Sequence, residues 1–311
     1  MNKNYQNIYK KVTKQTTHTV HDPVLLTEVL DVLKPQKGER YLDVTAGYGG
    51  HAAAVLAQTG NSAGAVLVDR DENAINYLQQ RFGDAVVLKQ QDFATASREL
   101  AAEGATFDLI LADLGVSSPH LDNAERGFAI RSDGPLDMRM DTQQELSAAT
   151  LLNSASEAVL IDILQRYGEE PKAAAIARKI IARRPLRTTS QLAALVREVW
   201  PGHSRVHPAT RTFQAIRIAV NDELGQLESS LPKWQQLLAP GGRLAVISFH
   251  SLEDRIVKQY FAEHAGDRYD ATLRILTKRP LVASATEAVL QPRARSAKLR
   301  AAAKIKNKKG N

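Results

Sequence analysis

The chain contains no cysteine, few aromatic residues and no long hydrophobic run. Its 311 residues include no cysteine and only 5% Phe, Trp and Tyr. Without cysteine, a disulfide framework and a thiolate metal site are both excluded. No apolar run reaches the roughly 18 residues of a membrane-spanning helix, so we expect no membrane segment. The first 20 residues are polar and lack the apolar core of a secretory signal, so we expect a cytoplasmic protein.

The charge of the chain is concentrated at its two ends. The sequence has 41 Lys and Arg against 34 Asp and Glu, a net charge of +7. Residues 1–20 and 288–311 together hold twelve cations and no acid, which leaves 29 cations against 34 acids in the body. We therefore expect a basic N-terminal extension over 1–20 and a basic C-terminal arm over 288–311. Such arms suit a polyanion such as RNA, and they are equally typical of solvated tails.

Apolar segments alternate with helical ones in the first part of the chain. We expect strands at 41–44, 65–69, 86–88 and 107–113, with a helix after each of the first three. Helices of this length between apolar strands indicate right-handed crossovers and a mostly parallel sheet that is covered on both faces. The sequence thus predicts an α/β fold.

The alternation stops after residue 120 and returns later in the chain. Residues 121–211 carry helical spacing and no convincing buried strand, whereas 243–249 reads as a strong strand. We therefore expect a discontinuous domain formed by 21–120 and 212–287. The segment 121–211 would be a helical domain inserted between its halves.

A glycine-rich run, 43–51, lies between the first strand and the first helix. Glycines at such a turn allow the backbone to approach a ligand, and the helix start offers unpaired N–H groups. Asp69 ends the next strand, where a carboxylate can bind both hydroxyls of a ribose, and Phe93 follows the third, where it can wall in an adenine. A cluster of glycines that serves only tight packing is the alternative. The three strand ends together favour a nucleotide cofactor site.

The kind of nucleotide is less tightly specified by this motif. The dinucleotide spacing tolerates Ala52 at its last position, so NAD is not excluded. No Walker lysine follows the glycines, which argues against nucleoside triphosphate hydrolysis. Asp43, within the strand itself, better suits a cofactor with an amino-acid end. We therefore expect S-adenosyl-L-methionine, with the methionine end near Gly49 and Gly50.

Asp113 ends the fourth strand, where a substrate should meet the cofactor. Its carboxylate could bind the cofactor or accept a hydrogen bond from an amino group that is being methylated, which favours the pyramidal amine. Capping of the following loop is the structural alternative.

His203 and His207 are four residues apart, but Pro208 follows and no carboxylate completes a triad. We therefore expect no metal site.

Many motifs in this chain resemble the RsmH (MraW) family, the bacterial 16S rRNA cytosine-N4 methyltransferases. The segments that carry the resemblance are 21–26 (HDPVLL), 47–51 (GYGGH), 69–71 (DRD), 113–119 (DLGVSSP), 125–128 (ERGF), 133–141 (DGPLDMRMD), 167–170 (YGEE), 207–215 (HPATRTFQA), 248–255 (SFHSLEDR) and 292–296 (PRARS). They occur in order and span about residues 18–300.

The resemblance implies a class I S-adenosylmethionine-dependent methyltransferase fold with an inserted helical domain. It implies methylation at N4 of a cytidine in the decoding region of 16S rRNA, within the small ribosomal subunit, and it leaves a homodimer open. The family's cofactor contacts match Gly49, Gly50, His51, Asp69, Phe93 and Asp113 of this sequence. A glutamine usual after Ser-Ser-Pro is His120 here, which can still donate one hydrogen bond. Of these residues, Asp113 is expected to face the chemistry.

Two other functions are compatible with the same residues. A methyltransferase that acts on a protein or small molecule would keep the cofactor site without the RNA role. A non-enzymatic RNA-binding protein would retain a relic nucleotide site and bind no S-adenosylmethionine. Cofactor binding separates the last from the other two, and the identity of the methylated fraction separates those from each other.

Overall fold

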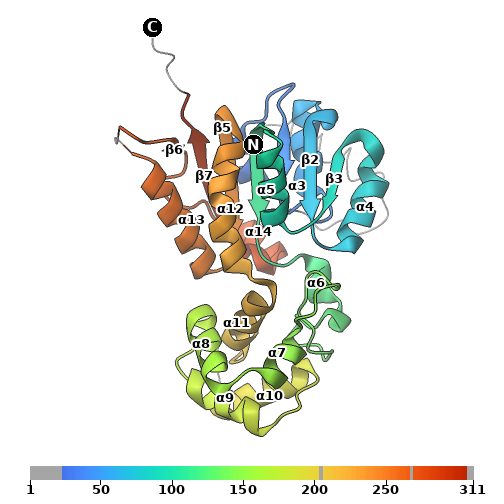
Figure 1. The fold of residues 1–311 in the computed structure, drawn as a ribbon, viewed down its shortest axis with the longest axis vertical. Helices are drawn as coiled ribbons and strands as arrows, with labels where there is room; N and C mark the ends of the chain where they lie inside the picture. The colour runs from blue at the N-terminus through green and yellow to red at the C-terminus, as the bar shows by residue number, and fades with distance from the viewer. Residues whose placement is uncertain (1–22, 203–205, 267–268, 307–311) are drawn as a thin grey trace.

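The computed structural model describes residues 23–202, 206–266 and 269–306. Figure 1 shows two parts, a sheet covered by helices and a block of helices beside it. The strands are β1 (Tyr41–Asp43), β2 (Ala65–Asp69), β3 (Val87–Gln90), β4 (Phe107–Asp113), β5 (Leu238–Ser248), β6 (Leu273–Ile275) and β7 (Lys298–Lys304). They form a seven-stranded sheet in the order β3-β2-β1-β4-β5-β7-β6.

The first five strands are parallel, and β7 enters antiparallel between β5 and β6. The chain moves outward from β1 to β2 and β3, then returns to place β4 on the other side of β1. This reversal makes the carboxyl edge between β1 and β4 the switch point where open α/β sheets bind ligands. The α/β fold expected from the sequence is confirmed.

Helices cover both faces of the sheet. Those in this part of the molecule are α2 (Leu26–Leu33), α3 (Gly50–Thr59), α4 (Glu72–Phe82), α5 (Phe93–Ala102), α12 (Glu223–Leu237), α13 (Ser251–His264) and α14 (Ala285–Leu290). Because side chains alternate along a strand, Leu42 packs with Trp234 of α12 on one face. Its neighbour Tyr41 packs with Val55 of α3 on the other. The core is therefore two apolar layers with the sheet between them.

The helical block is inserted between β4 and β5. It contains α6 (Ser118–Asp122), α7 (Ala148–Ser154), α8 (Glu157–Gly168), α9 (Ala173–Ala182), α10 (Thr189–Val199) and α11 (Thr210–Asn221). These helices bury a hydrophobic cluster of their own, which includes Leu164, Ile176 and Ile216. Side chains cap the starts of α7, α8 and α10; for example, Thr188 and Gln191 form a capping box on α10. Since α11 contributes Ile216 and Val220 to this cluster, the helical block extends beyond the boundary expected at residue 211.

The expectation of a basic arm over residues 288–311 is wrong for most of that segment. Residues 298–304 form β7, in which Ala301 and Ala302 are fully buried. Two of the cations counted as arm residues, Lys298 and Arg300, bind Asp254 of α13 at 3.1 and 2.6 Å. These two cations therefore form ion pairs within the protein. Residues 307–311, and the N-terminal extension expected over 1–20, lie outside the described residues.

No helix in the described part of the chain is long and apolar enough to cross a membrane.

Candidate active site

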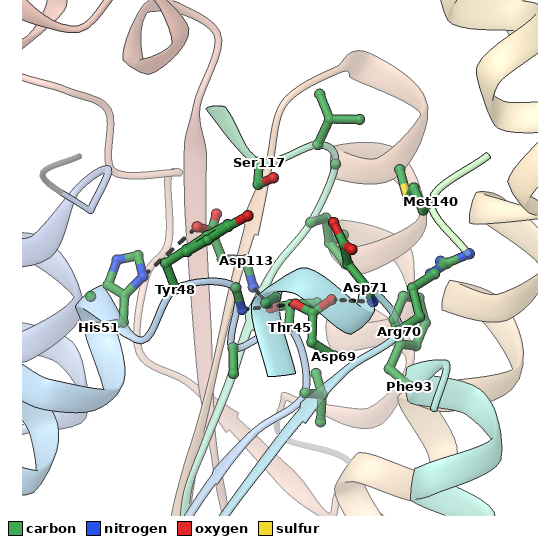
Figure 2. Close-up of a pocket in the computed structure, with 18 of the residues that line it drawn as sticks. Thr45, Tyr48, His51, Asp69, Arg70, Asp71, Phe93, Asp113, Ser117 and Met140 are labelled. Atoms are coloured by element: carbon green, nitrogen blue, oxygen red, sulfur yellow. Dashed lines mark hydrogen bonds and ion pairs between the residues drawn. The ribbon is translucent and has the colours of Figure 1, made fainter. Parts of the chain in front are cut away.

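A cavity of about 440 Å³ opens at the carboxyl edge of β1, β2 and β4. Residues from strand ends far apart in the sequence line it, among them Thr45, Asp69, Phe93 and Asp113. Its volume is in the range of small-molecule sites, and it occupies the switch point of the sheet. Figure 2 shows these side chains converging, with His51 facing Asp113.

The glycine-rich turn shapes one wall of this cavity. Gly47 and Gly49 have φ of 52° and 72°, the left-handed region that favours glycine. Gly49 is the N-cap of α3, its N–H donates to the carbonyl of Ala46, and a methyl group on it would lie 2.7 Å from the Phe82 ring. Gly50 and His51 line the cavity, whereas Gly49 does not. Gly49 thus sets the turn from behind the wall, and Gly50 and His51 face the ligand space.

Asp69 lines the cavity and also braces the turn. Its Oδ2 accepts the N–H of Gly47 at 2.8 Å, and its Oδ1 accepts the N–H of Asp71 at 2.9 Å. The expected ribose-binding carboxylate therefore has a second task, because it joins the end of β2 to the loop after β1. The sequence spacing alone did not indicate this bracing role.

Asp71 extends the same connection to the inserted helices. It caps α4 and pairs with Arg126 of the insert at 3.2 Å. Arg126 also donates to the carbonyls of Arg139 and Met140. The insert is thereby linked to the wall of the cavity.

Phe93 is the first residue of α5 and forms an apolar wall. Its ring lies 5.7 Å from that of Trp234, whose Nε1 donates to Ser97 Oγ at 2.8 Å. Asp92 caps the helix by accepting the N–H of Thr95, which fixes where Phe93 points. The side chain of His120 lies outside the described part of the structure, so its expected contact stays a prediction.

Asp43 does not face the ligand, contrary to the expectation for the methionine end. Its side chain is 1% exposed and absent from the cavity lining. The register explains this: Asp43 pairs with Leu111 and Leu67, so Asp113 and Asp69 lie two residues nearer the carboxyl edge. Asp43 instead accepts hydrogen bonds from the Tyr41 hydroxyl and the Thr45 N–H. Burial raises the pKa of Asp43 to about 6, although His51 and Tyr41 act to lower it.

Asp113 presents an incompletely satisfied carboxylate to the cavity. The hydroxyl of Thr45 accepts its backbone N–H at 2.6 Å and thereby fixes the end of β4. Its side chain is 22% exposed, yet Oδ1 is buried and has no hydrogen-bond partner in the structure. Oδ2 lies 3.7 Å from His51 Nδ1. Burial raises the pKa of Asp113 to about 7, against the lowering effect of Arg293.

Two residues that line the cavity, Tyr48 and Arg293, were not named as site residues from the sequence, although both lie in motifs of the family resemblance. Tyr48 lies 5.2 Å from the ring of Tyr77, and its carbonyl accepts a hydrogen bond from Arg81. Arg293, from the far end of the chain, donates to the carbonyl of Val116 and lies over the Phe249 ring. A signal for Arg293 was present, since the motif 292–296 belongs to the family resemblance.

One group of three described residues lies close enough to hold a metal ion: Glu223, His250 and Glu253. Glu223 already accepts two hydrogen bonds from Arg217, and Glu253 Oε2 accepts the N–H of Phe249. His250 Nδ1 accepts the N–H of Glu253, so the proton of a neutral ring is on Nε2, which faces Glu253 Oε1 at 3.2 Å. Because a metal would have to displace that proton, this group is best described as a network of polar and charged side chains at the wall of the cavity, which Glu223 and Glu253 line.

The charge of the cavity distinguishes between the candidate cofactors. Among the described residues its lining includes five carboxylates and two cations: Asp69, Asp71, Asp113, Glu223, Glu253, Arg70 and Arg293. Asp71 and Glu223 are paired with Arg126 and Arg217, and the other carboxylates favour the positive charge of a sulfonium over the pyrophosphate of a dinucleotide. The buried, unpartnered Oδ1 of Asp113 suits a cationic or hydrogen-donating ligand. The residues present therefore fit S-adenosylmethionine better than NAD.

Comparisons with known proteins agree with this chemistry. The model of the MraW methylase family matches residues 18–305. A protein of Heliobacterium modesticaldum named ribosomal RNA small subunit methyltransferase H is 49% identical over 311 residues, which covers 92% of this chain and 99% of that relative. A protein of the same name from Cyanothece is 48% identical over 287 residues, covering 92% of this chain and 95% of the relative.

Solved structures resemble the chain more distantly. An rRNA methylase from Streptococcus thermophilus has a TM-score of 0.41 and 10% identity, covering 93% of this chain and 100% of that one. A methyltransferase homologue from Pyrococcus horikoshii has a TM-score of 0.45 and 12% identity, covering 96% and 82%. Likeness of this degree supports no conclusion about function.

Proposed function

Because the chain belongs to the MraW methylase family, we propose that it methylates the exocyclic N4 of a cytidine in the decoding region of 16S rRNA, using S-adenosylmethionine. The relatives named above are small-subunit rRNA methyltransferases, which supports the RNA substrate class. The choice of N4 and of the decoding region comes from the resemblance of the sequence motifs. The observation that carries the chemistry is the buried, unpartnered Oδ1 of Asp113 at the switch point.

The cofactor would occupy the side of the cavity formed by β1, β2 and β3. Phe93 would contact the adenine, Asp69 would accept hydrogen bonds from the ribose, and Gly50 and His51 would lie along the amino-acid end. The start of α3 offers backbone N–H groups that have no acceptor within the helix. When bound, S-adenosylmethionine supplies a methyl group on a positively charged sulfur.

Asp113 would act on the amine that receives the methyl group. The lone pair of an exocyclic cytosine amine is delocalised into the ring, so the amine is a poor nucleophile. A carboxylate that accepts an N4–H hydrogen bond favours the pyramidal form and receives the proton lost on methylation. The fixed backbone of Asp113, held by Thr45, places this acceptor at a defined point. The main contribution of the protein is therefore positioning in a dry site.

The acceptor base would enter from the side of the inserted helices. Met140 of the insert and Glu223 at the start of α12 line that side of the cavity. A cytosine paired in RNA must be extruded, or presented unstacked, before its N4 can reach Asp113. We propose that the helical block, as part of the substrate-recognition region, docks on the RNA of the small subunit.

Radiolabelled methyl transfer tests this proposal. Small subunits from cells that lack this gene are incubated with the protein and labelled S-adenosylmethionine, and the RNA is digested to nucleosides. We expect label in N4-methylcytidine with the wild type and, with Asp113→Asn, a loss of methyl transfer that is much larger than any loss of cofactor affinity. Asp31→Asn, an exposed change on α2, serves as the matched control. Label in protein, in a small molecule or in another nucleoside would contradict the proposal.

A further inference from the structure

His51 and Asp113 face each other in a geometry that depends on one proton. His51 Nε2 lies 2.9 Å from the carbonyl oxygen of Val24, and a carbonyl can only accept, so Nε2 carries a proton. The neutral ring then presents the lone pair of Nδ1 to Asp113 Oδ2, 3.7 Å away. If Asp113 is ionised, a lone pair meets an anion and no hydrogen bond can form. If one proton is added, on either group, a hydrogen bond closes between them.

The burial of His51 and of Asp113 Oδ1 makes the free energy of the pair sensitive to this proton. His51 is 6% exposed, and Asp113 Oδ1 is buried without a partner. Because the imidazole is buried, water has little access to His51 Nδ1, and the free energy of the pair depends on its proton. The two groups also line the same cavity as the proposed cofactor contacts. A charge placed in that cavity acts directly on them.

We propose that His51 and Asp113 form a single shared proton site, which loses its proton when the positively charged cofactor binds and regains one when the methyl group has been transferred. This inference rests on the proposed use of S-adenosylmethionine. In it, Asp113 is the group that touches the amine. His51 is a positioning residue, which acts through Asp113 by offering Nδ1 as the acceptor.

Other charged groups around the pair determine how strongly it holds its proton in the absence of cofactor. Asp43 and Tyr41 of β1 lie beneath it, Glu253 of α13 and Arg293 face Asp113, and Glu287 of α14 faces His51. Asp43 and Glu253 favour the protonated pair, and Arg293 opposes it. Burial raises the pKa of Asp113 to about 7 and lowers that of His51. The carboxyl is therefore the side that holds the proton at rest, within the reach of ordinary pH.

The proposed site keeps the proton balance of the reaction. Methyl transfer forms the N4–C bond and breaks the S–C bond, whose electron pair stays on sulfur. N4 then loses one proton, which passes to Asp113 and is held by the hydrogen bond to His51 Nδ1. The positive charge on sulfur disappears in the same step, so the proton affinity of the pair rises when a proton becomes available. Asp113 thus holds a proton less strongly before methyl transfer, when it must accept a hydrogen bond, and more strongly afterwards, when it must take up the proton.

Proton release on cofactor binding tests the proposal without any RNA. Binding enthalpies are measured by calorimetry in buffers of different ionisation enthalpy between pH 6 and 8. S-adenosylhomocysteine is the matched ligand, because it has the same adenosine and amino-acid end with a neutral sulfur. An opposite charge nearby lowers the pKa of an acid by one unit or more. For a group near 7, S-adenosylmethionine should then release about 0.4 proton more than S-adenosylhomocysteine at pH 7.

Proton release by three variants tests whether the released proton comes from the His51–Asp113 pair. Asp113→Asn should abolish the extra release. His51→Gln, which keeps an amide near Val24 and cannot titrate, should move the release to lower pH by about one unit, the size of one lost hydrogen bond. His264→Gln on α13 removes a histidine that stacks on Tyr260, outside the cavity lining, and should leave the release unchanged.

Two results would overturn the inference. Equal proton release by the two ligands in the wild type would show that the sulfonium charge does not act on the pair, and this comparison needs no variant. An unchanged release curve in folded His51→Gln would remove His51 from the site. The failure of the rRNA assignment would leave both measurements intact, because only the cofactor is present.

Discussion

Replacing Asp113 by Asn should stabilise the folded protein at alkaline pH. Burial raises the pKa of Asp113 to about 7 from an ordinary value of 3.8. The folded protein then binds more protons than the unfolded chain between about pH 4 and 7. The contribution of Asp113 to the free energy of unfolding is therefore fully present below about pH 4. It is lost as the pH rises through 7. Asparagine has nearly the same shape as aspartate and does not ionise. The variant therefore does not lose this stability as the pH rises.

The size of the effect follows from the pKa shift. A rise of about three units corresponds to at most about 4 kcal/mol. Of this, about 2 to 3 kcal/mol falls between pH 5 and pH 8, the interval in which the folded carboxyl gives up its proton. We therefore expect the free energy of unfolding of Asp113→Asn, relative to wild type, to be about 2 kcal/mol more favourable at pH 8 than at pH 5. The comparison of two pH values cancels any constant cost of the substitution.

Urea denaturation of the cofactor-free protein at the two pH values measures this difference. Asp31→Asn on α2 is the matched control, because this side chain is exposed and its substitution should behave alike at both pH values. An equal effect of Asp113→Asn at pH 5 and pH 8 would refute the reasoning, since Asp113 would then ionise as easily in the fold as in the unfolded chain. A stabilised but inactive variant would show that this carboxylate is kept for function at the expense of stability.

Three further predictions follow from contacts around the cavity. Asp69→Ala should weaken S-adenosylmethionine binding by about 2 kcal/mol in calorimetry and also lower the urea midpoint, because Asp69 braces Gly47; unchanged affinity would remove it from the site. Arg126→Ala should cost about 2–3 kcal/mol of stability by removing the ion pair with Asp71 and the hydrogen bonds to two carbonyls, and a loss below 0.5 kcal/mol, about the size of an ordinary surface change, would contradict this. Deletion of residues 288–311 should abolish cooperative unfolding in circular dichroism, since it removes β7 from between β5 and β6; a folded, active truncation would show that the strand is dispensable.

The last of these predictions changes how the C-terminal segment is interpreted. Its cations suggested an arm that binds RNA, and deleting such an arm would have separated docking from catalysis. In the structure, Lys298 and Arg300 pair with Asp254, and the alanines between them are core. A deletion therefore reports on folding, and RNA docking has to be tested by substitutions at exposed positions.

Much of the architecture could be predicted because its signals are local. The short apolar runs at 65–69 and 107–113 are typical of buried strands, and the helices between them begin at residues that cap them. The turn at 47–51 requires positive φ at Gly47 and Gly49, which only glycine adopts without strain. Dense motifs over most of the chain then identified the family. None of these inferences needs to know which residues meet in space.

The remaining features depend on long-range packing, which leaves little trace in the local sequence. The segment KLRAAAK has no strand pattern, and it is a strand because β5 and β6 provide hydrogen-bonding partners on both sides. Arg293 reaches the cavity only because that strand returns the end of the chain to the sheet.

The different positions of Asp43 and Asp113 relative to the cavity were likewise decided by tertiary structure. Each carboxylate ends a neighbouring strand next to the glycine turn, and their sequence contexts are alike. The parallel register places Asp43 opposite Leu111, one side-chain repeat deeper than Asp113. By itself the sequence therefore determined the family, the order of elements and the strand ends that form the site. Only the pairing of the strands decided that Asp43 is buried below the cavity whereas Asp113 lines it, because register is a relation between segments far apart in the chain.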